Sequence, residues 1–305
     1  MEAIVYEEFG GPEVLRHTTG APVPEPGPGE VRVRVAAVGV NPLDYKRREG
    51  WVEQFYPTTF PAVPGLEFAG TVDAVGEGVT EVAPGDEVLG WTKTGAYAEY
   101  ALAGDIVRKP AELSWERAAS LPVAGETAQR VLDRLGVRRG ETLLLHGAAG
   151  AVGAIAVQLA VAAGVTVVGT ASERNHDYLR SLGAIPVTYG DGLAARVRAA
   201  APQGVDAVFD AAGHDTLPVS LELTGGSTER IVTIAANDAE QYGVHFSSGG
   251  TPPETVRAGL TEHARLAAEG RLDVRVDQVL PLALAAKAQE LSQAGHAKGK
   301  LVIRL

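Results

Sequence analysis

The chain carries a cluster of small residues between Gly147 and Gly153 whose types and spacing suit the binding of a phosphate group. An apolar run precedes this cluster and an apolar helical pattern follows it, which predicts a strand, a tight turn and the start of a helix. Small side chains at such a turn let a phosphate approach the free N–H groups of the helix N-terminus. The spacing Ala148-x-Gly150-x-x-Gly153 is an alanine-first version of the dinucleotide fingerprint.

Small residues also suit any tight strand–helix packing, so this motif alone leaves nucleotide binding open. If it does bind a dinucleotide, the pyrophosphate is expected at the backbone of Ala148, Gly150, Ala151, Val152 and Gly153. The motif begins about 140 residues into the chain, so a whole domain must precede it.

A second group of polar residues follows the next predicted strand, roughly 20 residues after the glycine turn, where NAD-binding sites usually place an acidic residue on the ribose 2′-hydroxyl. This chain has Ser172 there, followed by Glu173 and Arg174. A serine with an arginine nearby favours the 2′-phosphate of NADPH through charge-assisted hydrogen bonds. Glu173 keeps NADH open, and an ordinary solvated loop would also be polar.

The elements that position these residues fall into two regions of different character. The first 110 residues alternate short β-like runs with Gly/Pro turns, which predicts a compact, mostly β region. Arg32 and Arg34 alternate with valines, as on a half-solvated antiparallel strand. The strands expected here are Ala3–Tyr6, Glu30–Val38, Glu67–Val75, Glu87–Leu89 and Tyr97–Leu102.

From about Ser114, apolar strands alternate with helices, which predicts an α/β fold with a doubly wound parallel sheet of the Rossmann type. The strands expected are Thr142–His146, Val165–Thr170, Pro186–Thr188, Ala207–Asp210 and Arg230–Ala235. The helices expected are Trp115–Ser120, Ala124–Leu135, Val152–Ala163, His176–Leu182, Gly192–Ala200 and Leu217–Leu223. The last part of the chain is expected to form the helices Glu254–Glu269 and Leu282–Ala294 and the strands Val274–Leu280 and Lys300–Leu305.

Composition narrows the classes of protein and site. A length of 305 residues favours two domains over one. The net charge of −11 argues against sequence-independent nucleic-acid binding. The chain has no cysteine, which excludes disulfides, Cys-ligated zinc and thiolate nucleophiles. No signal-peptide pattern and no membrane-length apolar window are present, so a cytoplasmic enzyme without a membrane or nucleic-acid partner is expected.

The order of several motifs resembles the medium-chain dehydrogenase/reductase superfamily, in particular its zinc-independent quinone oxidoreductase and enoyl or alkenal reductase branch. The resemblance covers essentially the full length and implies a Rossmann dinucleotide-binding domain over 114–251. It also implies a β-rich, GroES-like catalytic domain over 1–113 and 252–305. Besides the turn at 147–153, the motifs are Gly11–Leu15, Val35–Gly50, Pro61–Val79, Pro84–Val88, Ala96–Tyr100, Leu121–Ala128 and Ala297–Ile303.

The chain departs from the zinc-dependent alcohol dehydrogenases of that superfamily at all three catalytic zinc ligands. Asn41 stands in place of the first ligand, Leu66 in place of the histidine, and Val123 about where the third ligand would be. Glu67 alone cannot hold a zinc ion that needs three protein ligands. The sequence therefore predicts no metal site.

The resemblance also implies which side chains contact the cofactor. Thr127 is expected to approach the nicotinamide, and Tyr189 is expected to pack near the 2′-phosphate. Ala211 and Ala235, at strand ends, are expected to line the cofactor cleft. Phe246 is a candidate to cover the nicotinamide, although it and the alanines could equally be packing residues.

Without a metal, substrate activation must come from hydrogen-bond donors, and the segment Asn41–Lys46 supplies them. We expect the amide of Asn41 and the phenol of Tyr45 to contact the substrate. Asn41-Pro42 is also a strong turn signal, and Asp44 could cap the short helix that follows. Lys46 and the two arginines after it are expected to form a solvated face.

Two other titratable residues lie close to the predicted cofactor site. Glu126, beside Thr127, could bind substrate or act as an acid if its pKa were raised. Pairing with Arg130, one helical turn later, is the preferred interpretation. His146 ends the first strand of the Rossmann unit and is expected to be a structural histidine with satisfied hydrogen bonds.

These residues together predict an NADPH-dependent, zinc-independent reductase that transfers hydride to a small-molecule quinone or an α,β-unsaturated carbonyl (enone). The resemblance further implies a homodimer. Two alternatives stay open. The chain could be a non-catalytic NADPH-binding protein of a crystallin-like or sensory kind, or a ketone or enoyl reductase dedicated to one pathway.

Overall fold

A computed structural model describes residues 1–295 and 297–305 of the chain, which divides into two compact units. Unit 1 comprises Met1–Val123 and Pro253–Leu305, and unit 2 comprises Ala124–Pro252. The first boundary was expected after residue 113 and lies after Val123 instead, because the helix α2 (Trp115–Ala119) packs on strands β3 and β4 of unit 1. The second boundary lies one residue from the expected position.

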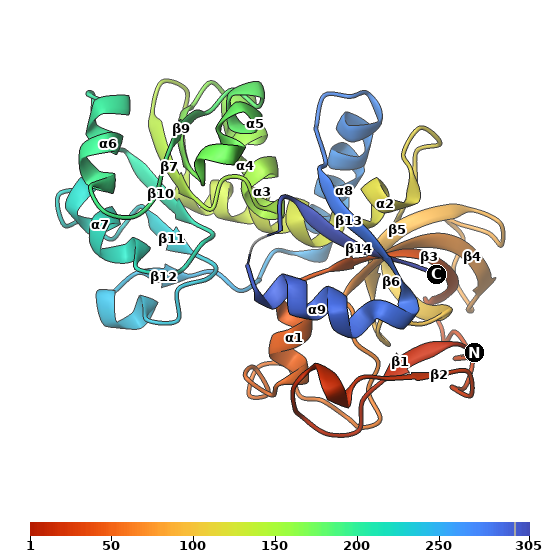
Figure 1. Cartoon of the computed structure of the whole chain (residues 1–305). Helices are drawn as coiled ribbons and strands as arrows, with labels where there is room; N and C mark the ends of the chain where they lie inside the picture. Colours follow the sequence, from red (N-terminus) through yellow and green to blue (C-terminus); the bar gives the residue numbers. More distant parts are fainter. Residues whose placement is uncertain (296) are drawn as a thin grey trace. The chain divides into compact units, whose positions relative to one another are not determined.

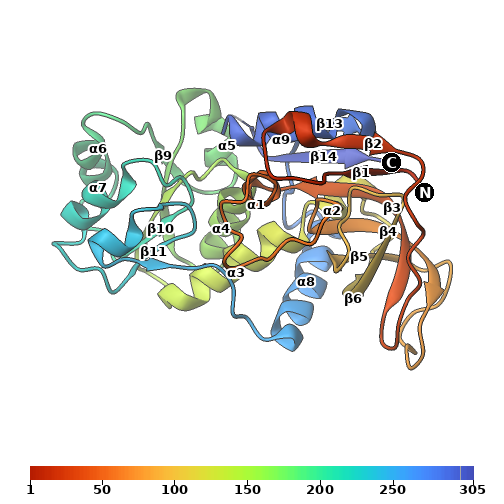
Figure 2. The ribbon, with the colours of Figure 1, turned by 90° about the horizontal axis from the view of Figure 1, so that it is seen from below.

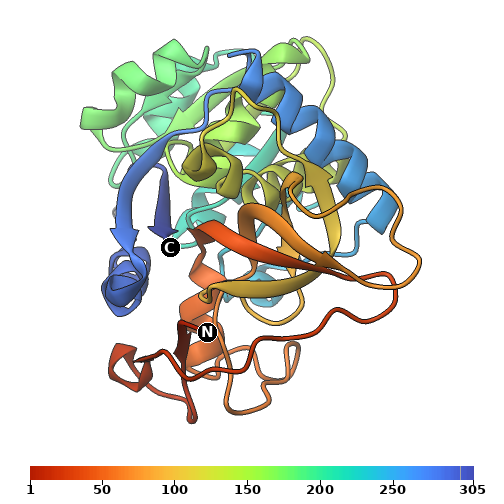
Figure 3. The same cartoon turned by 90° about the vertical axis from the view of Figure 1, so that its right-hand side faces the viewer.

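Unit 1 is built on a six-stranded sheet in the order β13-β14-β3-β4-β5-β6. A further pairing of β3 with β6 closes four of these strands into a small barrel, whose strands curve round in Figure 3. A separate antiparallel pair joins β1 (Ala3–Val5) to β2 (Arg16–Thr18). The strands of the main sheet are β3 (Val31–Val40), β4 (Glu67–Val75), β5 (Glu87–Thr92), β6 (Tyr100–Arg108), β13 (Val276–Pro281) and β14 (Lys300–Arg304).

Alternation along β3 explains how this sheet has a buried and a solvated face. Val31, Val33 and Val35 are buried, while Arg32 and Arg34 between them are not. Arg32 donates to Asp73 at 2.7 Å across the antiparallel pairing with β4, as expected for a half-solvated strand.

The helices of unit 1 cover the edges of its sheet. The helix α9 packs against α1 and against β13 and β14, and the short helix η1 lies beside it, as Figures 1 and 2 show. The helix α8 packs along β6. The helical segments are η1 (Pro12–Val14), α1 (Pro42–Arg48), α2, α8 (Pro253–Ala268), η4 (Leu282–Leu284) and α9 (Ala285–Gln293).

Unit 2 is a fully parallel, six-stranded sheet in the order β12-β11-β10-β7-β8-β9. All five residues of β7 are buried, which fits a parallel strand that is covered on both faces. The strands are β7 (Thr142–His146), β8 (Thr166–Thr170), β9 (Ile185–Val187), β10 (Ala207–Asp210), β11 (Ile231–Thr233) and β12 (His245–Phe246). The helical segments are α3 (Pro122–Leu135), α4 (Ala151–Ala162), η2 (Glu173–Asn175), α5 (His176–Ser181), α6 (Leu193–Ala200), α7 (Thr216–Leu223) and η3 (Ala239–Tyr242).

These elements confirm the expected α/β class, with a doubly wound parallel sheet and a β-rich region. The strands β4, β7 and β10 have the predicted bounds. The strand β2 was not predicted, and the expected helix Leu282–Ala294 divides into η4 and α9. In the described part of the chain, no helix combines the length and the apolar character that a membrane crossing requires.

Candidate functional site

The strand order of unit 2 reverses direction between β7 and β10. From β7 the chain first builds outward through β8 and β9, and then returns to build β10, β11 and β12 on the other side. The register pairs His146 with Asp210, so the next residues, Gly147 and Ala211, leave the sheet side by side. A Cβ on Gly147 would lie 3.0 Å from the carbonyl oxygen of Ala211. Open α/β sheets bind their ligands at such a switch point.

The glycine turn at this point has the shape that a pyrophosphate needs. Gly147 has a φ of +72°, which few other residues adopt, and Gly150 is the N-cap of α4. A Cβ on Gly153 would overlap the carbonyl oxygen of Gly147, so only glycine allows the helix to start this close to the turn. A Cβ on Gly150 would meet only that same oxygen, at 3.4 Å, so the space in front of Gly150 is open.

The first amides of α4, which include those of Ala151 and Val152, have no acceptor within the helix, because intrahelical bonding starts with Ala154 donating to Gly150. Ala148 is fully buried, and its Cβ lies so close to β8 that a Cβ added to Gly169 would be only 2.8 Å away from it. The alanine therefore fills a gap between turn and sheet. Free amides and an open approach fit the pyrophosphate of a dinucleotide.

The polar residues predicted to select NADPH lie at the same edge of the sheet. Ser172 follows β8, and its hydroxyl accepts a hydrogen bond from the side chain of Asn175 at 3.2 Å. Arg174 is exposed, and its guanidinium has no partner in the described part of the chain. Tyr189 follows β9, which pairs with β8, and its side chain is 59% exposed. An unpaired arginine at this edge is available for an anion.

Two buried polar side chains shape the loops on the other side of the switch point. Asp210 accepts hydrogen bonds from the amides of Ala212 and Gly213 at 3.0 and 2.9 Å and from the hydroxyl of Thr233 at 2.6 Å. Thr233 in turn accepts from the amide of Ala235 at 3.0 Å. This pair positions the two strand ends on which Ala211 and Ala235 lie.

Glu126 forms the expected ion pair with Arg130, and both residues also bind side chains that the sequence did not indicate. The carboxylate of Glu126 accepts from Arg130 at 2.8 Å and from the hydroxyl of Thr251 at 2.8 Å. Arg130 also donates to Ser247, so helix α3 is tied to both ends of the segment Ser247–Thr251. Thr127 lies within this group and is nearly buried.

Two further residues of unit 2 have clear environments. The side chain of Phe246, on the edge strand β12, is 42% exposed. His146 is buried between Ser220, at 3.1 Å, and Thr170, at 3.5 Å, and burial lowers its pKa to about 4. It is the neutral structural histidine that the sequence predicted.

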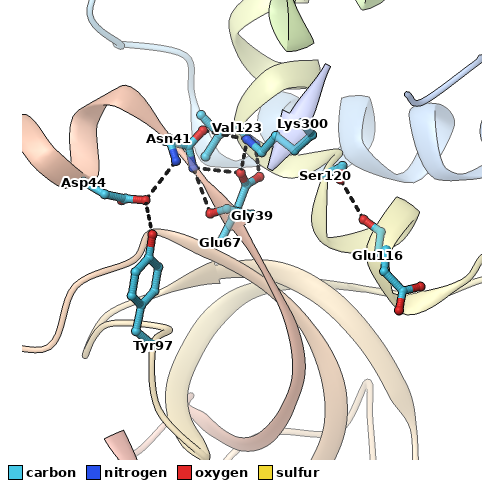
Figure 4. A network of polar contacts seen from close by, with 9 residues as sticks. All are labelled: Gly39, Asn41, Asp44, Glu67, Tyr97, Glu116, Ser120, Val123 and Lys300. Atoms are coloured by element: carbon cyan, nitrogen blue, oxygen red, sulfur yellow. Dashed lines mark hydrogen bonds and ion pairs between the residues drawn. The ribbon is translucent and has the colours of Figure 1, made fainter. Parts of the chain in front are cut away.

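In unit 1, Asn41 belongs to a buried network (Figure 4). Its side-chain nitrogen donates to Glu67 Oε1 at 2.8 Å and to the carbonyl of Gly39 at 3.3 Å. Its side-chain oxygen accepts from Lys300 Nζ at 2.7 Å. Lys300 Nζ also lies 2.5 Å from Glu67 Oε1, and the amide of Val123 donates to Glu67 Oε2 at 2.7 Å. Both amide hydrogens of Asn41 are therefore used inside the protein.

The same network fixes the start of α1. Asp44 accepts from the backbone N–H of Asn41 at 2.9 Å, as the expected helix cap, and from the hydroxyl of Tyr97 at 3.0 Å (Figure 4). Its second carboxylate oxygen is buried without a partner among the described residues. Burial is the main cause that raises the pKa of Asp44 to about 7, and it also raises the pKa of Tyr97.

Tyr45, next on α1, has a different environment. Its ring packs edge-on against Trp51, with centroids 6.0 Å apart, and its hydroxyl has no hydrogen-bond partner in the part of the chain described. Burial raises its pKa. Lys46 is half-buried, and burial lowers its pKa. The expected solvated face is wrong for Arg48, which is fully buried because α1 packs against α9.

The three positions that hold zinc ligands in zinc-dependent enzymes are occupied by residues that do not fit zinc. Asn41 and Val123 both contact Glu67, so these positions do converge, but they offer no thiolate or imidazole. The cation that Glu67 faces is the ammonium of Lys300. Over residues 1–295 and 297–305, no group of three or more His, Cys, Asp or Glu side chains could hold a metal ion.

Sequence reasoning missed three of these interactions. A lysine that begins the apolar strand Lys300–Arg304 was a signal for a buried cation, but its partner Glu67 lies on a distant strand. The polar ends of β10 and β11, Asp210 and Thr233, carried a similar signal. Nothing in the sequence links Arg130 to Ser247.

Comparisons with known proteins agree with this geometry. The chain matches the families described as "Alcohol dehydrogenase GroES-like domain", over residues 27–111, and "Zinc-binding dehydrogenase", over residues 182–303. It is 32% identical to the chloroplast envelope quinone oxidoreductase homolog of Arabidopsis thaliana, over 99% of this chain and 98% of that protein.

Two further proteins are similar to the chain. The chloroplastic NADPH-dependent alkenal/one oxidoreductase of Arabidopsis thaliana is 34% identical over 74% of this chain and 61% of its own length. The crystal structure of Escherichia coli quinone oxidoreductase complexed with NADPH has a TM-score of 0.88 with 27% identity, and the match covers 100% of both chains.

The substitutions Gly150→Ala and Gly153→Ala should have different effects, the first on the affinity for NADPH and the second on the stability of the fold. Gly150 has a φ of −76° and open space before it, so Gly150→Ala should change the free energy of unfolding by less than about 0.5 kcal/mol. The added methyl group would stand where a pyrophosphate must approach, so we expect NADPH affinity to fall at least about tenfold. Fluorescence titration with NADPH measures this, and unchanged affinity would contradict the placement of the pyrophosphate. Gly153→Ala should instead lower stability in urea, because its Cβ would overlap backbone.

Asp44 should make unit 1 less stable as the pH rises. Its pKa is about 7 in the fold and near the ordinary 3.8 in the unfolded chain, so the folded state binds this proton more tightly. Between these values the stability that Asp44 contributes falls with rising pH. Urea unfolding at several pH values measures this effect. From the lower to the upper pKa, the free energy of unfolding of Asp44→Asn should rise relative to that of the wild type by on the order of 4 kcal/mol.

Asp86→Asn is the matched control for that experiment. Asp86 is partly exposed, and a hydrogen bond from Arg108 lowers its pKa below the ordinary value. The stability it contributes is present above that ordinary value and is lost only as the pH falls further. Asp86→Asn should therefore show a constant difference from the wild type between pH about 4 and 7. A constant difference for Asp44→Asn as well would show that Asp44 is charged throughout.

Proposed function

We propose a function from one premise: the chain belongs to the quinone oxidoreductase branch of the medium-chain dehydrogenase/reductase superfamily. We infer that it uses NADPH to reduce quinones or α,β-unsaturated carbonyl compounds. One observation carries the inference: the open glycine turn and the unpaired Arg174 lie at the same edge of the unit 2 sheet. Relatives named for NADPH, quinones and alkenals support it.

NADPH, when bound, supplies a hydride, and the chain supplies the binding and the polar contacts. The amides that start α4 would hold the pyrophosphate, and Ser172, Arg174 and Tyr189 would hold the 2′-phosphate. Alcohols and simple aldehydes need strong polarisation of their oxygen, which a zinc ion supplies in the zinc-dependent relatives. Quinones and enones suit hydrogen-bond donors, because delocalisation spreads the developing negative charge.

Within unit 1, we assign the substrate contact to Tyr45 and a positioning role to Asn41. The hydroxyl of Tyr45 is free to donate to a carbonyl oxygen, whereas the amide hydrogens of Asn41 are bound to Glu67 and Gly39. Tyr45→Phe therefore tests substrate binding: the variant should bind substrate more weakly, whereas its affinity for NADPH should not change. The further cofactor contacts of Thr127, Ala211, Ala235 and Phe246 are proposed on their positions at or beside strand ends of unit 2.

We also propose a homodimer that works in the cytoplasm. The edge strand β12 supports the dimer, because it pairs only with β11 in the described chain and a second copy could add a strand at its open backbone edge. Light scattering would read the mass directly against the 31.7 kDa of one chain. Fractionation of the source cell would test the location.

Turnover tests the proposed reaction. Purified protein should consume NADPH with a 1,4-quinone and with a 2-alkenal, at a kcat/KM at least about tenfold above that for a saturated aldehyde of equal length. Addition of EDTA should leave the rates unchanged. Tight NADPH binding without turnover on either substrate would favour the non-catalytic alternative. A preference for one ketone or enoyl thioester over both would favour the pathway-specific reductase.

Cofactor choice has a separate test in Arg174→Ala. Loss of a charge-assisted hydrogen bond to the 2′-phosphate should raise the KM for NADPH by roughly ten- to a hundredfold and leave the KM for NADH nearly unchanged. Arg180→Ala is the matched control, since Arg180 is an exposed arginine nearby that pairs with Asp177 at 2.6 Å. Equal effects of Arg174→Ala on the two cofactors would remove the assignment.

A further inference from the structure

Arg196, on helix α6, binds the backbone of an entire loop. Its guanidinium donates to four consecutive carbonyl oxygens, those of Thr188 at 2.8 Å, Tyr189 at 3.3 Å, Gly190 at 3.1 Å and Asp191 at 2.7 Å. All three guanidinium nitrogens take part. No carboxylate in the described chain pairs with it, so this arginine serves the loop rather than an ion pair.

This loop joins β9 to α6, and besides the Arg196 side chain the backbone N–H groups of Leu193 and Arg196 donate to the carbonyls of Gly190 at 3.0 Å and Gly192 at 3.2 Å. Gly190 and Gly192 have φ values of +86° and +74°, and the residues from 189 to 192 are exposed. Glycine-rich backbone loses much conformational entropy when it is ordered. The fixed fork of a guanidinium can bind several carbonyl groups at once, whereas the compact ammonium of a lysine cannot reach all four in one geometry.

The loop lies beside the proposed 2′-phosphate contacts. Strands β8 and β9 are parallel neighbours, with Thr170 paired to Val187, and the amide of Ala171 donates to the carbonyl of Val187 at 3.0 Å. The residues that follow both strands leave the sheet at the same edge. Ser172 and Arg174 follow β8, and Tyr189 follows β9.

We propose that Arg196 is a positioning residue for cofactor selection, which fixes the Thr188–Asp191 loop so that Tyr189 is held in place for the 2′-phosphate of NADPH. The inference rests on the proposed NADPH site and deepens it. Arg196 touches no cofactor itself. Because Arg196 orders the loop in advance, the loop loses less conformational entropy when the 2′-phosphate binds. This effect favours only the cofactor that carries that phosphate.

The test compares Arg196→Lys with Arg198→Lys by fluorescence and calorimetric titration. Arg198 lies on the same helix and forms an exposed ion pair with Glu222 at 2.7 Å, so its substitution controls for charge and helix effects. Arg196→Lys should weaken binding of NADPH and of 2′,5′-ADP about tenfold, and should change binding of NADH and 5′-AMP less than about twofold. Arg198→Lys should change none of them. Arg196→Gln is the second variant in case the first does not fold.

A double-mutant cycle with Tyr189→Ala adds a reading that a purely structural role would not produce. If Arg196 acts through Tyr189, the two substitutions together should weaken 2′,5′-ADP binding no more than the stronger one alone. Fully additive effects, or equal losses for NADPH and NADH, would overturn the inference. A wild-type protein that binds NADH as tightly as NADPH would overturn the cofactor choice as well. A wild-type preference for NADPH that survives Arg196→Lys would overturn only the role of Arg196.

Discussion

The buried ion pair between Lys300 and Glu67 is the interaction on which unit 1 depends most. It joins β14, near the end of the chain, to β4, and through Asn41 it also joins the start of α1. Charges taken out of water are costly unless each finds a partner, so removal of either residue alone would leave an uncompensated charge worth roughly 3–5 kcal/mol. Every hydrogen bond around the pair therefore helps to keep three distant segments in one arrangement.

The orientation of Tyr45, the proposed substrate contact, depends on that pair. The side chain of Asn41 is held by Glu67 and Lys300, and its backbone N–H donates to Asp44, which fixes the first turn of α1. With that turn fixed, Tyr45 packs against Trp51 with its hydroxyl unpaired. Asn41, one of the two donors expected from the sequence to contact the substrate, thus orders its surroundings, and Tyr45 retains a free donor.

The sequence predicted features that local pattern determines and missed those that depend on distant partners. The glycine turn, β7 and the Glu126–Arg130 pair were predicted because each depends only on residues that are a few positions apart in the sequence. The partners Glu67 and Lys300 are far apart in the sequence, and the fold alone brings them together. The boundary after Val123 was missed for the same reason, because α2 has a helical pattern but packs on the β-rich unit.

The proposed pyrophosphate contact and the proposed substrate contact are built differently, and this bears on how each would change. In unit 2, the turn proposed to face the pyrophosphate is shaped by backbone, through its glycines and the free amides at the start of α4. Binding of a pyrophosphate by such amides depends little on side chains, but a single Cβ at Gly150 would obstruct it. In unit 1, the proposed substrate contact is the side chain of Tyr45, which packs against Trp51 and takes no part in the buried pair. The proposed pyrophosphate contact is therefore constrained by the backbone of the turn, whereas the proposed substrate contact can change with one side chain.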